Sequence, residues 1–465
     1  MVGFIIKTQM RQQKIIKTEI FKEKAFQTLL GTIEKQGGVA MLIGGAVIDS
    51  IQGLPIKDVD IEVYGLSYAE LVVLIERLGL PCNLVGKSFG VIKTTIDRIE
   101  IDVSIPRKEN KVGIGHKGFQ ITLDGQMTPA EAGKRRDLTI NSMYQNLHNG
   151  EIVDPFNGLE DLKKGIIKAT SEDTFVEDPL RILRIMQLLP RKGKKVDKGT
   201  MELCQSMVNT FPELPKERVF VEWEKLLLKA DEPSLGLEFL RDSGWLINFP
   251  ELNDLIGCPQ NPIWHPEGDV WIHTKMVLDN AAKLRDQIPD DWKLAYMFGA
   301  LLHDIGKPST TTPDLKAHGH DTAGIEISET FLRRITNDKD LIYKVTTIVG
   351  LHMRPGQLFR SEAKEPAWKR LHNKCRLDIL GWQSKADSAG RTGRDVILDV
   401  YETSEKCFEL FEKFGKTKIE PLVLGRDLMA LGISPSKEFK WILDSCYEKQ
   451  LDGLTKEEII ASIEA

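Results

Sequence analysis

The chain has 465 residues, of which 41% are hydrophobic and 28% charged, a length that leaves room for roughly three domains. This composition excludes collagen-like and disordered chains, and no apolar run approaches the ~20 residues that a bilayer span needs. The net charge of −5 offers no global attraction to nucleic acid, so any basic surface must be local. The six cysteines are scattered without the spacing of a zinc site, which indicates free thiols and a cytoplasmic location.

The first part of the chain combines helical and strand patterns. Residues 1–37 predict an extension of one or two amphipathic helices, which ends at the Gly37-Gly38 pair. Beyond it, two segments alternate apolar and acidic residues, the pattern of a strand with one polar face. The predicted elements are strands at residues 39–43, 59–64 and 99–103 and a helix at residues 68–78. Strands that alternate with helices predict an α/β head over residues 38–165.

The rest of the chain shows helical spacing of apolar residues and few strand signals. We expect a helical neck and body at residues 166–255, a further helical domain at residues 256–400 and a helical tail at residues 401–465. The predicted helices lie at residues 179–189, 217–229, 234–246, 425–443 and 456–463. Pro190 is expected to end the first of these helices early, because proline cannot donate the backbone hydrogen bond that continues a helix.

A glycine turn and a set of acids form the first group of candidate functional residues. The Gly44-Gly45 pair follows a buried strand and can bring backbone N–H groups close to a triphosphate, since no Cβ stands in the way. Asp58 and Asp60 lie two residues apart, so on a strand their carboxylates share a face and favour a divalent cation such as Mg²⁺. Asp102, on a similar strand, is a third candidate. Two acids on a strand, taken alone, usually form a solvated strand face. The prediction therefore depends on the order and spacing of the glycine turn and the acidic pair.

These residues lie in a segment that resembles a known family. Residues 42–64, LIGGAVIDSIQGLPIKDVDIEVY, are similar to the opening motif of class II tRNA nucleotidyltransferases (CCA-adding enzymes) and bacterial poly(A) polymerases. Three more motifs resemble the family in its own order: RRDLTINSM at residues 135–143, IVDPFNGLEDL at residues 152–162 and EDPLRILR at residues 177–184. The resemblance implies a polymerase-β-like nucleotidyltransferase head followed by an all-α neck and body.

The resemblance also implies roles for individual residues. It makes Asp58, Asp60 and Asp102 the catalytic carboxylates, with Asp58 and Asp60 as the Mg²⁺ ligands. The residues that it implies for nucleotide binding are Gly44, Gly45, Asp49, Arg136, Asp137, Asn141, Asp178, Arg181 and Arg184. One departure is Ile48, which stands where the family usually has an arginine.

Asp178 and Arg181 have a chemistry that suits base recognition. On a predicted helix they are three residues apart and share a face. Asp178 would accept from the exocyclic amine of cytosine or adenine, and Arg181 would donate to the adjacent ring nitrogen. Uracil and guanine present a carbonyl and an N–H there, so they would leave buried polar groups unpaired. In the resembled family this pair selects CTP and ATP, whereas the structural alternative is an intrahelical salt bridge.

A second group of candidates surrounds the His303-Asp304 pair, which follows an apolar helix at residues 296–302. Together with the other members of the group, the pair resembles the ligand set of an HD phosphohydrolase domain, which implies a divalent metal such as Ni²⁺, Mn²⁺ or Mg²⁺. The predicted ligands are His273, His303, Asp304, His320, His352 and Asp387. His265 is expected to pack nearby or line the entrance without being a ligand. The alternative is a structural relic of such a domain.

The motifs together predict an enzyme that adds or repairs the CCA end of tRNA from CTP and ATP. The resemblance to HD-containing members implies an additional phosphatase or 2′,3′-cyclic phosphodiesterase activity. Two alternatives stay open: a poly(A) polymerase, and an HD phosphohydrolase whose head is only an RNA-binding module. The expected partners are tRNA and the two nucleotides, with no membrane, in a monomer or a homodimer.

Overall fold

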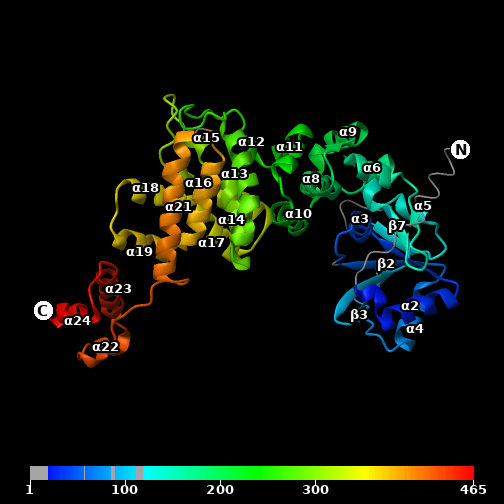
Figure 1. Cartoon of the computed structure of the whole chain (residues 1–465), viewed down its shortest axis with the longest axis horizontal. Helices are drawn as coiled ribbons and strands as arrows, with labels where there is room; N and C mark the ends of the chain where they lie inside the picture. The colour runs from blue at the N-terminus through cyan, green and yellow to red at the C-terminus, as the bar shows by residue number, and fades with distance from the viewer. Residues whose placement is uncertain (1–18, 57, 85–89, 112–118, 393, 465) are drawn as a thin grey trace. The chain divides into compact units, whose positions relative to one another are not determined.

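The computed structural model describes residues 19–56, 58–84, 90–111, 119–392 and 394–464 (Figure 1). The chain forms two compact units. The first comprises Met1–Val219 and Asp242–Trp245, and the second comprises Phe220–Arg241 and Leu246–Ala465.

The first unit begins with helical structure, as predicted for the part of the extension that lies within the described residues. A 3₁₀ helix, η2 (Glu19–Lys22), precedes helix α2 (Lys24–Lys35). The buried side chains of α2 are Phe26, Leu29, Leu30 and Ile33, and this spacing of three and four residues produces one apolar face.

A mixed six-stranded sheet forms the centre of the first unit, in the order β3-β4-β2-β1-β7-β8. Its strands are β1 (Val39–Ile43), β2 (Val59–Tyr64), β3 (Val91–Ile96), β4 (Ile99–Ser104), β7 (Tyr144–Asn146) and β8 (Ile152–Val153). Strands β2 and β4 are parallel, and the other neighbours are antiparallel. The predicted strands of the head are therefore confirmed. The smaller sheets join β5 (Arg107–Lys111) to β6 (Phe119–Leu123) and β9 (Ile166–Ile167) to β10 (Lys195–Val196).

The alternation along β2 determines which side chains face the core. Val59, Ile61 and Val63 are buried, whereas the acids between them lie on the opposite, half-buried face. Helix α3 (Gly45–Gln52) follows β1 directly, and its Ile48 is buried in the core. The position that carries arginine in the resembled family is therefore a packing position here.

The remaining helices of the first unit lie partly between the strands and partly after them in the sequence. They are α4 (Tyr68–Arg77), α5 (Pro129–Gly133), η4 (Thr139–Asn141), α6 (Gly158–Lys164), α7 (Glu172–Phe175), α8 (Leu180–Lys192), α9 (Lys198–Ser206) and η5 (Val208–Glu213), with α10 (Lys216–Lys229) continuing into the second unit. The expectation that Pro190 ends its helix is wrong, since α8 continues to Lys192. Proline lies in the last turn, where the amide of Gly193 still donates to Leu189 O at 2.9 Å.

The second unit is a helical bundle in which α13, α14, α16, α17, α20 and α21 pack against one another (Figure 1). Its helices are α11 (Ser234–Asp242), η6 (Trp245–Asn248), α12 (Pro250–Asn253), α13 (Val270–Leu284), η7 (Arg285–Gln287), α14 (Asp290–Leu302), α15 (Lys307–Thr310), α16 (His320–Ile335), α17 (Lys339–Leu351), α18 (Arg354–Arg360), α19 (Glu365–Lys374), α20 (Leu377–Ala389) and α21 (Arg394–Phe414). Trp223, Phe249 and Phe331 form an aromatic core, with ring centroids 5.1–5.9 Å apart.

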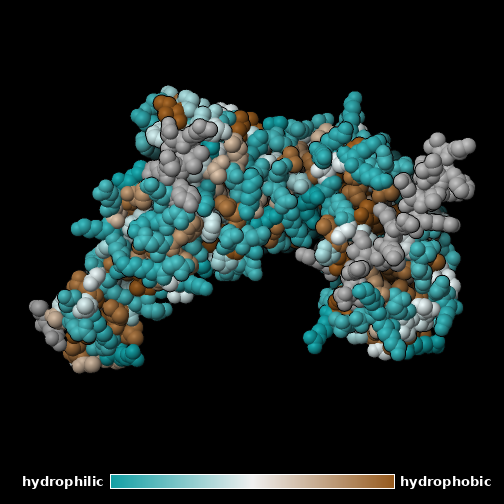
Figure 2. Space-filling view, in the orientation of Figure 1, coloured by the Kyte–Doolittle hydropathy of each residue, from teal (hydrophilic) through white to brown (hydrophobic). Residues whose placement is uncertain are grey.

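The tail contains three helices: α22 (Gly425–Ala430), α23 (Lys437–Leu451) and α24 (Lys456–Glu464). The single helical stretch predicted for residues 425–443 is wrong, because Gly432, with φ +83°, ends α22 and Pro435 disfavours helix for the residue before it. Large apolar side chains are exposed in the tail (Figure 2), among them Leu422 and Trp441. Among the described helices, none combines the length and apolar character needed to cross a bilayer.

Candidate functional sites

Two carboxylates face each other across neighbouring strands of the head. Asp60 on β2 is directly opposite Asp102 on β4 in the parallel register. Burial, together with the negative charges of Asp102 and Asp58, raises the pKa of Asp60. The Nζ atom of Lys93 lies 3.2 Å from Asp102 Oδ1. Carboxylates that repel each other in a half-buried position fit a divalent cation, whose charge would remove the repulsion.

The two carboxylates line a cavity of about 310 Å³. Its charged and hydroxyl lining residues are Asp60, Glu62, Asp102, Ser104, Arg107, Arg135 and Arg136. Mg²⁺ prefers oxygen ligands such as carboxylates, and a guanidinium group can donate two parallel hydrogen bonds to a phosphate group. The cavity therefore combines the two chemistries that a metal-bound triphosphate requires.

The structure modifies the predicted pairing of acids. Asp58 is exposed and precedes the first residue of β2, and it is not among the described residues that line the cavity. Glu62, which the sequence reasoning missed, lies two residues after Asp60 on the same strand face and lines the cavity. Its carboxylate accepts from Tyr64 Oη at 2.5 Å and lies 3.5 Å from Arg136. The unbroken apolar-acidic alternation of β2 was the signal that could have identified it.

The glycine turn opens onto free space. Gly44 has φ +66° and immediately precedes α3. A Cβ added at Gly44 or at Gly45 would meet no described atom within 4 Å, so backbone N–H groups at this turn are accessible to a ligand. Asp49 was also predicted for nucleotide binding. Its Oδ1 instead lies 2.8 Å from Lys192 Nζ, and this ion pair links α3 to α8.

Three residues predicted for nucleotide binding form one network around the buried carboxylate of Asp137. Asp137 Oδ2 accepts from Arg184 Nε at 2.6 Å, and its Oδ1 accepts from Asn141 Nδ2 at 3.0 Å. Burial would raise the pKa of Asp137, but the guanidinium of Arg184 and the amide of Asn141 lower it to about 2. Arg136 packs its guanidinium over the ring of Tyr144 at 5.3 Å. The network fixes the orientation of Arg184 through the carboxylate of Asp137.

The prediction that Asp178 and Arg181 share a helix is wrong. Helix α8 begins at Leu180, and Asp178 precedes Pro179, a position from which helical conformation is disfavoured. Asp178 Oδ1 instead accepts from the amide of Leu180 at 3.1 Å. Arg181 is buried and donates to Thr174 O at 2.5 Å and to Arg135 O at 2.6 Å. The two side chains are close in sequence, but no salt bridge between them occurs among the described contacts.

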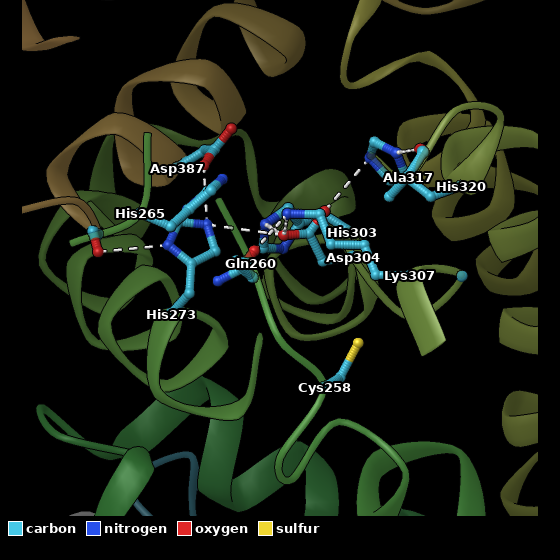
Figure 3. A network of polar contacts seen from close by, with 12 residues as sticks. Cys258, Gln260, His265, His273, His303, Asp304, Lys307, Ala317, His320 and Asp387 are labelled. Carbon is cyan, nitrogen blue, oxygen red and sulfur yellow. Dashed lines mark hydrogen bonds and ion pairs between the residues drawn. The ribbon is translucent and has the colours of Figure 1, made fainter. Parts of the chain in front are cut away.

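All six side chains predicted as HD ligands meet in the second unit. Figure 3 labels five of them: His273, His303, Asp304, His320 and Asp387. They come from α13, the end of α14, the start of α16, the end of α17, and α20. Asp304 is at the centre: its Oδ2 lies 3.2 Å from His303 Nε2 and 3.7 Å from His273 Nε2. Its Oδ1 lies 3.3 Å from His320 Nε2 and 4.0 Å from His352 Nε2.

The imidazole rings are oriented as metal ligands. In His303, His320 and His352, Nδ1 contacts the main-chain carbonyl three residues earlier, at 2.9, 2.7 and 2.7 Å. Because a carbonyl only accepts, Nδ1 carries the proton, and the lone pair of Nε2 faces the cluster. His303 Nε2 is buried without a hydrogen-bond partner among the described residues, and the Nε2 atoms of His320 and His352 are 3.2 Å apart. A cation would satisfy these lone pairs.

The candidate ligands divide into two groups that share a central acid. One group contains His273, His303 and Asp387, and the other contains Asp304, His320 and His352. Since the two oxygens of Asp304 face different groups, the arrangement has the donors for two neighbouring cations bridged by one carboxylate. Nitrogen and oxygen donors of this kind suit Mn²⁺, Fe²⁺, Ni²⁺ and Zn²⁺.

Charged residues that the sequence reasoning missed complete the second site. Lys307 Nζ lies 2.7 Å from Asp304 Oδ2, and Arg391 lies 3.1 Å from Asp387 Oδ2. Although burial would raise the pKa of Asp304, His303 and Lys307 hold it well below the usual range. Lys307 follows Asp304 by three residues, and this spacing within the HDIGK string was a usable signal.

The second site opens into a cavity of about 740 Å³. Its lining includes His265 and Trp264, as well as Asp304 and Asp387, so His265 lines the cavity as expected. Burial and the neighbouring His303 and His320 lower the pKa of His352 to about 4, which keeps that ring neutral and available as a ligand at neutral pH.

Three family profiles match the chain in consecutive segments. They are the poly A polymerase head domain at residues 40–168, the probable RNA and SrmB-binding site of polymerase A at residues 194–256, and the HD domain at residues 270–377.

Solved structures of CCA-adding enzymes have a similar fold. An apo form of a CCA-adding enzyme has 18% identity and a TM-score of 0.64, covering 96% of this chain and 96% of that chain. The Bacillus stearothermophilus CCA-adding enzyme in complex with CTP has 19% identity and a TM-score of 0.64, covering 95% and 97%. The Thermotoga maritima CCA-adding enzyme complexed with tRNA has 18% identity and a TM-score of 0.59, covering 97% and 98%.

These comparisons confirm the predicted fold class, a polymerase-β-like head followed by a helical body that includes an HD domain. The chain therefore contains a poly A polymerase head domain, a probable RNA-binding segment of polymerase A and an HD domain, in this order.

Proposed function

We propose that this protein adds or repairs the 3′-terminal CCA of tRNA, using CTP and then ATP. The observation that carries the proposal is the register of Asp60 opposite Asp102 at a cavity that also contains Arg135 and Arg136. Solved structures with this fold include CCA-adding enzymes bound to CTP, to ATP and to tRNA, which supports the same substrates here.

In the proposed reaction, the tRNA 3′-hydroxyl attacks the α-phosphorus of the nucleotide, and pyrophosphate leaves. Asp60 and Asp102, with Asp58 immediately before β2, would hold Mg²⁺, which would neutralise charge on the attacking and leaving oxygens. The guanidinium groups of Arg135 and Arg136 bind phosphate oxygens, and the backbone N–H groups after Gly44 contribute further donors.

Base selection is assigned to Asp178 and Arg181. Two N–H groups of Arg181 are occupied by main-chain carbonyls, and a guanidinium has five. The carbonyls fix the orientation of the group, and a remaining donor would meet the ring nitrogen of cytosine or adenine. Asp178 would accept from the exocyclic amine. Asp178→Ala is expected to reduce discrimination against UTP and GTP, with incorporation of each nucleotide as the measurement.

The decisive assay for this activity uses a tRNA that ends at the discriminator base and single labelled nucleotides. The proposal predicts addition of two cytidines from CTP alone, and one adenosine only after the cytidines are present. A ladder of adenosines without prior cytidine addition would identify a poly(A) polymerase and overturn the proposal.

We further propose that the HD domain hydrolyses phosphoesters, including phosphomonoesters and 2′,3′-cyclic phosphates. This second function is favoured by the cluster of six candidate ligands, of which Asp304, His320, His352 and Asp387 line the cavity of about 740 Å³. A metal held by these ligands supplies a nucleophilic hydroxide when bound. Lys307 and Arg391 provide positive charge for the substrate phosphate.

The phosphohydrolase proposal is tested with His303→Ala combined with Asp304→Ala, assayed on a 2′,3′-cyclic nucleotide. Hydrolysis should disappear while CCA addition continues at the parental rate. Hydrolysis that persists in this variant would contradict the assignment. If the head were only an RNA-binding module, the parental protein would hydrolyse the ester but add no nucleotide.

A further inference from the structure

A buried carboxylate outside the six candidate ligands lies against the HD cluster. Glu267 is in the segment between α12 and α13, and its side chain is only 1% exposed. Its Oε1 lies 2.9 Å from His265 Nδ1 and 2.9 Å from His273 Nδ1. A buried carboxylate is costly unless it is paired.

The contact with His273 determines which ring nitrogen faces the cluster. His273 Nε2 lies 3.0 Å from Asp387 Oδ1, on the metal-ligand side. On the other side, Nδ1 has Glu267 at 2.9 Å and Gly390 O at 3.3 Å. An ionised carboxylate and a carbonyl only accept, so Nδ1 carries the proton and Nε2 keeps its lone pair for the cluster.

His273 needs this external acceptor because of its position in a helix. The other histidines of the cluster are at helix ends, where a main-chain carbonyl three residues earlier accepts from Nδ1. His273 lies inside α13 (Val270–Leu284), where the main-chain carbonyls are used by the helix itself. Glu267 therefore supplies for His273 what a carbonyl supplies for the others, and it adds a negative charge.

We propose that Glu267 is a positioning residue of the HD metal site, which fixes the tautomer of His273 and makes its Nε2 a stronger ligand. This inference rests on the proposed HD function. A carboxylate behind a ligating imidazole holds the ring in place and raises its basicity. The same oxygen orients His265, whose ring packs edge-on against His273 with centroids 4.7 Å apart. Glu267 thus fixes two neighbouring imidazoles, of which His265 lines the cavity.

The test measures metal affinity and does not depend on hydrolysis. Ni²⁺ is titrated calorimetrically into the metal-stripped full chain carrying Asp60→Asn, so that the head carboxylates contribute less to the signal. Adding Glu267→Gln, which keeps the shape and removes the charge, should weaken Ni²⁺ binding about 10- to 100-fold. Glu267→Asp, which keeps the charge, should recover part of the lost affinity. In the assay with a cyclic nucleotide, excess Ni²⁺ should restore the rate of Glu267→Gln toward that of the parent.

Glu222→Gln is the matched control. Glu222 is also a buried glutamate of the second unit, with its side chain 3% exposed and paired to Lys225 at 3.0 Å, and its variant should bind Ni²⁺ like the parent. Equal affinity of Glu267→Gln and the parent would overturn the positioning role while leaving the HD function intact. Failure of Glu267→Gln to fold would assign Glu267 a structural role and also overturn the proposal. A parent that binds no metal would overturn both this inference and the HD function.

Discussion

The charge on Asp137 links the stability of the head to pH. Asp137 is buried and paired with Arg184 at 2.6 Å, and its pKa falls from 3.8 to about 2 in the folded protein. A group whose pKa is lower in the folded state stabilises the protein above its unfolded pKa, and this contribution disappears as the pH falls through the folded pKa. The difference corresponds to about 2 kcal/mol.

We therefore expect Asp137→Asn to lose more stability at neutral pH than at acid pH. Its deficit relative to the parent should shrink by about 2 kcal/mol between pH 5 and pH 2, as measured by urea unfolding at a series of pH values. A deficit that stays constant across this range would show that Asp137 is not held ionised by Arg184.

Metal binding at the imidazole cluster should stabilise the folded protein. Adding Ni²⁺ to the metal-stripped protein should raise the free energy of unfolding, by about 2.7 kcal/mol when free Ni²⁺ is 100 times its dissociation constant. The variant His303→Ala combined with Asp304→Ala removes two of the candidate ligands and should show no such increase. An equal increase in both proteins would place the binding outside the cluster.

Sites were predictable where neighbouring residues of the sequence share them, whereas contacts that only the fold creates were not. His303 and Asp304 are adjacent in sequence, whereas Glu267 reaches the same cluster from a loop whose side-chain direction no periodicity reveals. The helical pairing of Asp178 with Arg181 was wrong because Pro179 disfavours helical conformation for the residue before it.

At the scale of single elements, the turn between β1 and α3 depends on one glycine. Gly44 combines φ +66° with ψ −140°, a region that is essentially restricted to glycine. Gly45 is the first residue of α3 and does not have a positive φ. The two neighbouring glycines thus offer a matched pair of substitutions.

Gly44→Ala should reduce the free energy of unfolding by about 1–3 kcal/mol through backbone strain. Gly45→Ala should not reduce the free energy of unfolding and can increase it by up to about 1 kcal/mol, because alanine restricts the unfolded chain. Its Cβ would meet no described atom within 4 Å. Urea unfolding of both variants is the measurement. Equal losses at the two positions would contradict the account of this turn.

Elements with a clear period were predictable, and short or irregular ones were not. Strand β2 alternates buried and half-buried residues and was located correctly. Strand β3, VIKTTI, breaks the apolar alternation with two threonines, and β8 has only two residues. These strands form because the sheet provides hydrogen-bond partners, which a local pattern does not show.

At the scale of the whole molecule, the two candidate sites belong to different compact units. The carboxylates opposite one another on β2 and β4 are in the first unit, and the imidazole cluster is in the second. Their donor chemistry also differs, since oxygen ligands suit Mg²⁺ and mixed imidazole ligands suit transition metals. We therefore expect that CCA addition and phosphoester hydrolysis can each be removed without affecting the other.

Nucleotidyl transfer at the acids of β2 and β4 is tested by measuring CCA addition to a tRNA that lacks its CCA end. Three proteins are compared: the parent, Asp60→Asn, and His303→Ala combined with Asp304→Ala. Several kcal/mol of charge stabilisation depend on the carboxylates, so Asp60→Asn should lower the rate more than about 100-fold while retaining its melting temperature. The HD variant should add CCA at the parental rate. Parental addition by a folded Asp60→Asn protein would contradict the claim that the acids on β2 and β4 form the nucleotidyl-transfer centre.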